Sequence, residues 1–458
     1  MGGRVTQKTT KTIIRWEFFG LAFGAVFTRL LNIASPHTLV FDEVYYLRDF
    51  SPAYFTHAYY FDVHPPLGKL LIAGWMHLWH LSPDQALTAG LGTMRTLLAL
   101  FGIGVVLLTY DILWQLTKSR LCAGLGGLLV LLNGVFIVES RFVFMDGILV
   151  FFGLASLYAI IRWYNRPRWY WIVACGLLAG ATASVKWTGL TMLVLALGTL
   201  AFGAYKKHVA LTKAVLSGLV IVGLAAGVYI GTFWVHFRLL EQTGPGAAFM
   251  SSRFQASLQD TSHIPAAPIP FWAKFTELNK VMYHENATFT ETHAYSSKWY
   301  TWPLESRPVW LWRGNVMADG SAGNIYLAGN PTIWWLSSLS VCLSVLLLHK
   351  KIRKRYKPVL FAWCLLLAAY LINWLPFARI SRIMFLYHYL FASIFATMLL
   401  ALLARFVLLE VCSSQSQKRW VIGALVAASV LGFVWYSPLS YGWNLTPAAL
   451  HSREFFRP

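Results

Sequence analysis

Long apolar runs recur along the chain, and polar residues gather between them. A bilayer core about 30 Å thick requires roughly 20 apolar residues per helix, and the runs reach this length with helical rather than alternating patterning. They predict eleven membrane spans, at residues 13–34, 93–116, 121–138, 145–163, 169–185, 188–205, 210–236, 332–348, 358–376, 383–409 and 420–438. The pattern therefore predicts an all-α polytopic membrane protein.

Two long segments, 35–92 and 237–331, interrupt this helical rhythm. In the first, Pro66 suits the opening position of a helix because proline lacks the backbone donor that would be unsatisfied there. The helix that follows would carry Lys69, Ala73, His77 and His80 on one side. We expect such short helices to lie in the membrane interface rather than cross the bilayer. With no internal repeat and no linker, residues 1–458 form a single expected domain.

The distribution of charge predicts the orientation of the chain. Its formal net charge is +20, while only 12% of its residues are charged. Basic residues cluster in alternate short segments, at 4–15, 118–120, 162–168, 206–213, 349–357 and 418–419. The positive-inside rule then places the N-terminus in the cytoplasm, and the C-terminus and both long segments outside. This distribution argues against a nucleic-acid partner.

The cysteines and the first span point to no processing or metal chemistry. Five cysteines are scattered through the chain without a CxxC pair, which indicates packing residues rather than a disulfide framework or a thiolate site. The first apolar run is too long for a cleaved signal peptide, so we expect it to be retained.

An acidic pair, Asp42 and Glu43, follows the first span in "FDEVYYLRDF". Adjacent side chains point in different directions, so the two carboxylates cannot readily address one reacting atom. One could act as a general base while the other holds structure or an acceptor. The simpler interpretation is a solvated pair of loop carboxylates.

Basic residues at the predicted outer ends of spans form a second candidate group: Arg95, Arg141, Lys186, Lys298, Arg379 and Arg382. Charge at membrane depth is costly and usually lines a functional cavity. If several of these side chains converge, they would bind a phosphate, since arginine offers a bidentate fork and lysine a point charge. Alternatively, each extends toward lipid headgroups.

Other polar side chains allow more than one interpretation. His64 could contact a ligand, orient an acid or bond to a backbone carbonyl. "HAYSSKWYTWPL", with His293, Lys298, Trp299 and Tyr300, suits sugar or acceptor recognition, although an aromatic loop at the interface would look the same. His77 and His80 lack a third ligand at helical spacing, so we predict no metal site and no required cofactor. Dependence on a divalent ion is left open.

Seven segments together resemble, in order, the signature segments of the protein O-mannosyltransferase family. They are "FDEVYYLRD", "YYFDVHPPLGKLLIAG", "SVKWTGL", "GPGAAFMSSRFQASL", "HAYSSKWYTWPL", "ISRIMFLYHYL" and "PLSYGWNLTP". The resemblance implies the GT-C architecture and a lipid-phosphate-mannose donor. It implies that Asp42 is the catalytic base and that Arg95 is the family's essential arginine. His64 then corresponds to the histidine of the family's HPP turn, and Lys186 to the lysine of its VKW segment. Glu43 would position the acceptor or brace the loop.

The expected reaction is an inverting transfer of mannose from a polyprenyl or dolichyl phosphate to serine or threonine hydroxyls of proteins. Chemical reasoning gives the same outline, because a lipid phosphate needs charge stabilisation to leave and the hydroxyl needs a base. The basic set would bind the donor phosphate. Alternatives are transfer of another sugar, transfer to a lipid acceptor and, more remotely, a transporter, although no repeat symmetry supports the last.

One departure from the family concerns the β-trefoil MIR domain of eukaryotic members, for which "QDTSHIPAAPIPFW" (259–272) leaves no room. We therefore expect a prokaryotic form in the plasma membrane, or an ER protein if the source is eukaryotic. Its expected partners are the lipid-linked donor, secreted or membrane acceptor proteins and the bilayer, with a dimer as one possible state.

Overall fold

The computed structural model describes residues 15–259, 267–288, 292–347 and 357–454. The basic residues expected at 4–11 and most of the basic segment 349–357 lie outside the described residues.

Each of the eleven predicted spans overlaps helical structure, although one of them is divided into two helices. Within the described residues, seven helical stretches are long and apolar enough to cross a bilayer: Leu91–Thr117, Met145–Asn165, Trp187–Tyr205, Leu211–Leu239, Val359–Arg379, Leu386–Glu410 and Gln415–Tyr441. The corresponding helices are α5 (Leu91–Thr117), α8 (Met145–Asn165), α10 (Leu190–Tyr205), α11 (Leu211–Leu239), α16 (Lys357–Ile372), α17 (Leu390–Glu410) and α18 (Gln415–Tyr441). The helices at the remaining predicted spans are shorter: α1 (Trp16–Leu30), α6 (Arg120–Leu131), α9 (Trp169–Val185) and α14 (Pro331–Leu347).

The predicted span 121–138 is two helices rather than one. Helix α6 ends at Leu131, and α7 (Gly134–Val138) begins after Asn133. The Asn133 amide oxygen accepts a hydrogen bond of 3.2 Å from the backbone nitrogen of Asn330. A Cβ at Gly134 would lie 2.5 Å from the Ala328 carbonyl oxygen, so glycine allows the close approach. The break therefore joins the helical core to the segment that precedes α14.

Small residues let the spanning helices pack closely. A Cβ at Gly180 in α9 would lie 2.7 Å from the Ala225 Cα atom in α11, so the two backbones nearly touch. Helices α11 and α18 carry most of their apolar side chains on the surface, including Leu216, Leu219 and Leu431. Exposed apolar faces of this kind suit contact with lipid, whereas α8 and α17 are largely buried.

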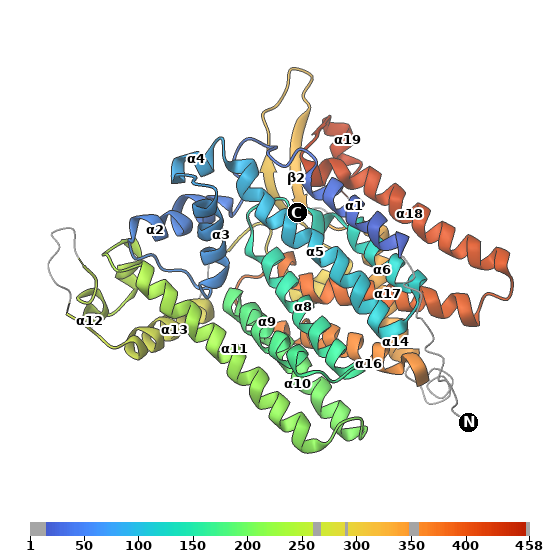
Figure 1. The fold of residues 1–458 in the computed structure, drawn as a ribbon. Helices are drawn as coiled ribbons and strands as arrows, with labels where there is room; N and C mark the ends of the chain where they lie inside the picture. The colour runs from blue at the N-terminus through green and yellow to red at the C-terminus, as the bar shows by residue number, and fades with distance from the viewer. Residues whose placement is uncertain (1–14, 260–266, 289–291, 348–356, 455–458) are drawn as a thin grey trace, which may run out of the picture.

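A small three-stranded antiparallel sheet adds to the predicted helical architecture. It consists of β1 (Val309–Arg313), β2 (Ala322–Leu327) and β3 (Asn444–Leu445), in the order β1-β2-β3. Every residue of β2 is buried, and the hairpin projects from one end of the helix bundle, beside α19 (Pro447–His451) (Figure 1). The strand sequences VWLWR and AGNIYL lie within the segment 237–331, and neither is long enough to give a clear alternating pattern of apolar and polar residues.

The first long segment folds into η1 (Tyr45–Phe50), α2 (Ser51–Thr56), α3 (Leu67–Leu78) and α4 (Pro83–Leu87). The predicted polar side of α3 is split, because Lys69 and Ala73 are buried while His77 and His80 are exposed. Lys69 forms an ion pair with Asp62, and its ammonium also donates a hydrogen bond of 2.7 Å to the His64 carbonyl oxygen. Lys69 therefore closes the turn that precedes its own helix.

The second long segment packs against the first. It contains η3 (Pro245–Phe249), α12 (Ser252–Gln255), α13 (Phe271–Thr288) and η4 (Trp299–Leu304), followed by β1 and β2. The Tyr59 backbone nitrogen donates to the Gln242 carbonyl oxygen at 2.8 Å, and the Gly246 nitrogen donates to the Tyr59 carbonyl oxygen at 3.0 Å. The two polar segments are therefore joined through their backbones.

Candidate active site

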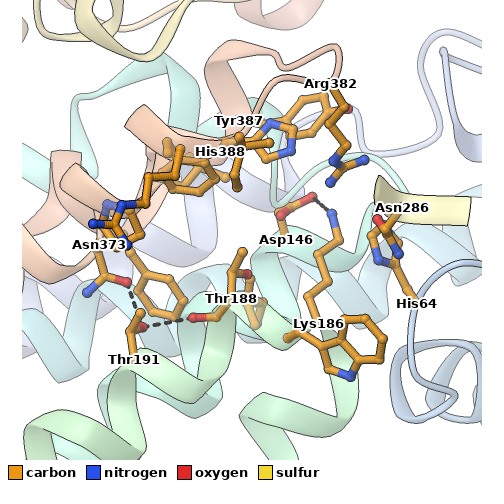
Figure 2. A pocket seen from close by; sticks show the side chains of 18 of the residues that line it. His64, Asp146, Lys186, Thr188, Thr191, Asn286, Asn373, Arg382, Tyr387 and His388 are labelled. Carbon is orange, nitrogen blue, oxygen red and sulfur yellow. Dashed lines mark hydrogen bonds and ion pairs between the residues drawn. The ribbon is translucent and has the colours of Figure 1, made fainter. Parts of the chain in front are cut away.

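A large cavity of about 540 Å³ opens where the two polar segments meet the ends of the spanning helices. The HPP turn, the start of α8, the α9–α10 junction, the end of α13 and the segment between α16 and α17 all contribute lining residues. We call this space the large cavity, and Figure 2 shows many of the side chains that line it.

Two cationic side chains reach into the large cavity from opposite walls. Lys186 lies between α9 and α10, and its ammonium forms an ion pair of 2.6 Å with Asp146 in the first turn of α8. Arg382 comes from the loop after η5 (Leu375–Arg379), and its guanidinium points toward the same space as Lys186 (Figure 2). Arg379 also lines the cavity and is exposed. The basic residues outnumber the single carboxylate here, which favours an anionic ligand.

The rest of the large cavity combines hydrogen-bonding groups with an apolar wall. The Thr191 hydroxyl donates 2.7 Å to the Asn373 side-chain oxygen. His64 and Asn286 lie side by side across from them (Figure 2), and burial together with Lys186, Lys69 and Arg382 lowers the pKa of His64 well below its ordinary value. A neutral imidazole can exchange hydrogen bonds with a hydroxyl-rich ligand. The apolar lining consists of residues such as Leu149, Val150, Ile372, Leu390 and Phe391.

A second space, the side cavity, holds Asp42. It measures about 390 Å³ and is lined by Asp42, Phe41, Tyr45, His293 and Phe385, among others. The side cavity shares three lining residues with the large cavity: Arg382, Tyr387 and His388. The side cavity, which holds Asp42, therefore adjoins the cationic large cavity at these three residues.

A third space, the small cavity, lies beside Asp42 and measures about 20 Å³. Its lining includes three carboxyl groups, Asp42, Glu139 and Asp146, together with Tyr46 and Tyr387. Burial raises the pKa of Asp42 to about 6, against the opposing charge of Lys186 and with added repulsion from Asp146 and Asp62. A carboxylate with a pKa near neutrality can accept a proton during a reaction and release it afterwards.

The backbone around Asp42 is held in an uncommon conformation. Phe41 adopts φ of 47°, in the left-handed region, which costs on the order of 1 kcal/mol for a residue with a Cβ. The Asp42 carbonyl oxygen then accepts the Tyr45 backbone nitrogen at 3.0 Å as η1 begins. Such a turn persists only when surrounding contacts fix it.

Those contacts come from Glu43 and Arg95. Both side chains are fully buried. The Arg95 guanidinium donates to both Glu43 oxygens, at 2.9 and 2.7 Å, and to four carbonyl oxygens of residues 33, 34, 36 and 38. Arg95 therefore braces the loop and is not available to a donor phosphate, which corrects the expectation for Arg95. Glu43 has the second of its two expected roles, because it braces the same loop.

Arg141 is likewise a structural residue. It is 1% exposed, and its guanidinium donates to the carbonyl oxygens of Arg29, Leu31 and Asn32 at the end of α1. These carbonyls lack partners within the helix, so Arg141 caps α1. This geometry replaces the expectation that Arg141 binds the donor phosphate.

The recognition segment 293–300 is only partly at the site. His293 lines the side cavity and its ring contacts Phe385 with centroids 5.2 Å apart. Trp299 instead packs on Trp374, while Lys298 and Tyr300 are exposed, and none of these three residues lines the large, side or small cavity. The expectation of sugar or acceptor contact is therefore supported by placement for His293 and not for the other three.

Several residues of the site escaped the sequence analysis. Asp146 and Glu139 lie in the turn "ESRFVFMDG", where two acids flank a short apolar stretch between predicted spans. Two acids in a short turn between predicted spans are a pattern from which a functional site could have been predicted. Tyr387 and His388 lie in the signature segment "ISRIMFLYHYL" but were not singled out within it. Asn373 gave no signal, because polar residues at span ends are common in membrane proteins.

Comparisons with known proteins point to one enzyme family. A family model described as dolichyl-phosphate-mannose-protein mannosyltransferase matches residues 21–241, and one described as the C-terminal four-transmembrane region of protein-O-mannosyltransferase matches residues 271–458. Protein O-mannosyltransferase 1 of Drosophila melanogaster is 34% identical over 274 residues, which are 54% of this chain and 30% of the relative. Dolichyl-phosphate-mannose–protein mannosyltransferase 1 of Candida albicans is 29% identical over 272 residues, 53% of this chain and 30% of the relative. This chain thus spans about a third of the length of these relatives.

Solved structures share the fold. The Saccharomyces cerevisiae protein O-mannosyltransferase Pmt1–Pmt2 complex bound to the sugar donor superposes with a TM-score of 0.89 at 18% identity, covering 98% of this chain and 93% of the matched chain. ArnT from Cupriavidus metallidurans superposes with a TM-score of 0.55 at 14% identity, covering 93% of this chain and 76% of that one. The fold is that of the GT-C glycosyltransferases.

Proposed function

Because this chain belongs to the protein O-mannosyltransferase family, we propose that it transfers mannose from a lipid phosphate to serine and threonine hydroxyls of proteins. The observation that carries this proposal is the set of shared lining residues, Arg382, Tyr387 and His388, at which the side cavity with Asp42 adjoins the cationic large cavity. A base and an anion site in adjacent spaces are what a single displacement at a glycosyl phosphate requires.

The donor occupies the large cavity in this proposal. Lys186, Arg379 and Arg382 bind its phosphate, and their positive charge stabilises the lipid phosphate as it leaves. The neighbouring apolar side chains of α8, α16 and α17 suit the first part of an isoprenoid tail. His64 and Asn286 then face the sugar hydroxyls.

The acceptor occupies the side cavity, next to Asp42 and His293. The acceptor hydroxyl oxygen attacks the anomeric carbon and forms the new C–O bond, while the bond from that carbon to the phosphate oxygen breaks. Asp42 removes the hydroxyl proton during attack, and the bonding electron pair leaves with the lipid phosphate. One displacement with one carboxylate base inverts the anomeric configuration, in contrast to double displacement with two carboxylates.

The surroundings of the enzyme follow from the same proposal. The clustering of basic residues in alternate short segments supports an outer-face location for both polar segments and hence for the site. A polyprenyl carrier in a prokaryotic plasma membrane fits the short passage at 259–272, and dolichol would fit an ER location. The Saccharomyces cerevisiae relative forms a Pmt1–Pmt2 complex, which supports a dimer as the functional unit of this protein.

The proposal is tested with purified protein in detergent or vesicles. Polyprenyl phosphate mannose and a serine- and threonine-rich peptide are supplied, with and without a chelator, and the product is identified by mass spectrometry. We expect mannose on a serine or threonine hydroxyl, with an anomeric configuration opposite to that of mannose in the donor. Absence of mannose on the peptide, or a product that retains the anomeric configuration of the donor, would refute it.

A further inference from the structure

Glu139 is a buried carboxyl group that the proposed reaction does not use. Its side chain is 4% exposed, and its Oε2 atom has no hydrogen-bond partner among the described residues. A buried polar atom without a partner costs roughly 1–3 kcal/mol, so its retention beside Asp42 calls for an explanation.

The position of Glu139 is rigid. It follows α7, and its backbone nitrogen donates to the Val135 carbonyl oxygen at 3.1 Å. The neighbouring Ser140 hydroxyl donates to the Phe136 carbonyl oxygen at 2.7 Å, and a Cβ at Gly102 in α5 would overlap the Ser140 side chain. On the other side, a Cβ at Gly147 would lie 2.9 Å from the Glu139 carbonyl oxygen. The side chain thus starts from a backbone wedged between α5 and α8.

In the part of the chain that the structure describes, only one of the carboxyl groups near Glu139 has a cationic partner. Asp146 has Lys186 as its cation, at 2.6 Å, whereas no ion pair or side-chain hydrogen bond of the described residues involves Asp42. Glu139 also has no cationic partner among the described residues, so two of the three carboxyl groups of the small cavity, Asp42 and Glu139, lack a counterion. Two ionised carboxylates without a cation in one buried space are unfavourable, and the more deeply buried one holds a proton.

Other titratable groups face this space. Those near Glu139 and Asp42 are Asp146, Lys186, Asp62, Tyr46, Tyr387, His293, Arg382 and His388. Burial raises the pKa of Glu139 well above its ordinary value, with Asp146 and Asp42 adding to the effect and Lys186 opposing it.

We propose that Glu139 is a positioning residue for the catalytic base: its protonated carboxyl group donates a hydrogen bond to the Asp42 carboxylate. The small cavity, about 20 Å³, can hold one water, so the bond runs directly or through that water. The donated bond stabilises the ionised form of Asp42 and orients its second oxygen toward the side cavity. This inference rests on the proposed function, because it gives Glu139 a role in the same transfer.

The test compares Glu139→Gln with Glu139→Ala in the full-length protein. Glutamine keeps a donor at the same place, so its rate and pH profile should stay within about twofold of wild type. Alanine removes the donor, so the pKa of Asp42 should rise. The acidic limb of the plot of rate against pH should therefore shift to higher pH by about one unit. The alanine variant should then regain most of its lost rate at about pH 8.5, where Asp42 ionises without help.

Glu305→Gln is the matched control. Glu305 is also fully buried with an unpartnered Oε2 atom, and it accepts a hydrogen bond from the Gly329 backbone nitrogen, but it lines none of the three cavities. Its substitution should leave the acidic limb where it is. Equal loss of activity in both Glu139 variants at every pH, or an unmoved limb in Glu139→Ala, would overturn the inference.

Infrared difference spectroscopy supplies a readout that does not need turnover. At neutral pH the wild-type protein should show a protonated-carboxyl band that Glu139→Gln lacks. Absence of that difference means that Glu139 is ionised, and the inference fails. Wild-type protein without any transferase activity would instead refute the proposed function, whatever the spectrum shows.

Discussion

At the residue scale, two adjacent acids have different surroundings. Asp42 is partly exposed at the junction of the side and small cavities, whereas Glu43 is fully buried in a bidentate pair with Arg95. Glu43 also accepts the backbone nitrogens of Val40 and Val143, both at 2.9 Å. The neighbour that looks equivalent in sequence therefore holds the loop on which Asp42 is presented.

Replacing Asp42 by asparagine should abolish transfer, because the amide cannot accept the hydroxyl proton. With burial raising the pKa of Asp42 to about 6, the wild-type rate should fall about tenfold per pH unit below that value as the base becomes protonated. Initial rates at saturating donor, measured from about pH 5 to about pH 8, test this. Asp49→Asn, seven residues along the same segment, should retain activity. Full activity of Asp42→Asn would remove it from the role.

Replacing Arg382 by alanine should weaken donor binding. Loss of one hydrogen-bonded charge from a phosphate site should raise the donor KM roughly ten- to hundredfold, with a smaller effect on the acceptor KM. Steady-state kinetics with each substrate varied in turn separate the two. Arg313→Ala removes the same charge from an exposed position on β1 and should leave the donor KM unchanged. An effect confined to the acceptor would contradict the proposed phosphate site.

At the element scale, single side chains join segments that are far apart in sequence. Arg95 ties α5 to residues 33–43, and Arg141 ties the α7–α8 turn to the end of α1. Both satisfy carbonyl oxygens that would otherwise be buried without partners. These contacts position the catalytic loop on the helical core.

Replacing Arg95 by methionine should unfold this junction. Breaking a buried ion pair costs roughly 3–5 kcal/mol, because the remaining charge is left uncompensated, and six hydrogen bonds to Glu43 and the loop carbonyls are lost. Thermal unfolding in detergent should therefore show a clear loss of stability, while Arg382→Ala unfolds like wild type. If the Arg95→Met protein were stable and only its KM for the donor were raised, Arg95 would instead bind the donor phosphate.

Replacing Gly246 by alanine should separate the two long polar segments. The added Cβ would overlap the backbone nitrogen of Phe61 and lie 2.5 Å from the carbonyl carbon of Tyr60, and these backbone atoms can yield little. We expect faster proteolysis within 237–259 and reduced transfer. Gly231→Ala in α11, where an added Cβ meets nothing within 4 Å, is the control. Equal protease resistance of both variants would show that this contact is not critical.

At the scale of the whole molecule, the polar segments gather at one end of the helix bundle (Figure 1). Helix α18 has 27 residues and is therefore about 40 Å long. It runs from the neighbourhood of Cys412 to β3, which pairs with the hairpin. Cys412 and the hairpin tip should consequently lie on opposite faces of the membrane.

Cysteine labelling tests this orientation. In a chain freed of its other cysteines, Ala318→Cys at the exposed hairpin tip should react with a membrane-impermeant maleimide in intact cells. A chain that retains only Cys412 should react only in inverted vesicles. The reverse pattern would place the site in the cytoplasm and contradict the proposed use of outward-facing substrates.

The sequence by itself determined the helical membrane architecture, because each spanning helix satisfies its own backbone hydrogen bonds and needs a local apolar run to do so. All eleven predicted spans overlap helical structure, and the motifs identified the family. Short strands and the break at Asn133 were missed, since they depend on partners distant in sequence, such as Asn330.

Only the tertiary structure decided which charges serve the site. Arg95 and Lys186 look alike as basic residues at span ends, yet the first is enclosed by carbonyl oxygens and the second lines an open cavity. Burial and the identity of contacting groups set the role of an ionisable side chain. Both arise from segments brought together by folding, so no local pattern of residues could have distinguished them.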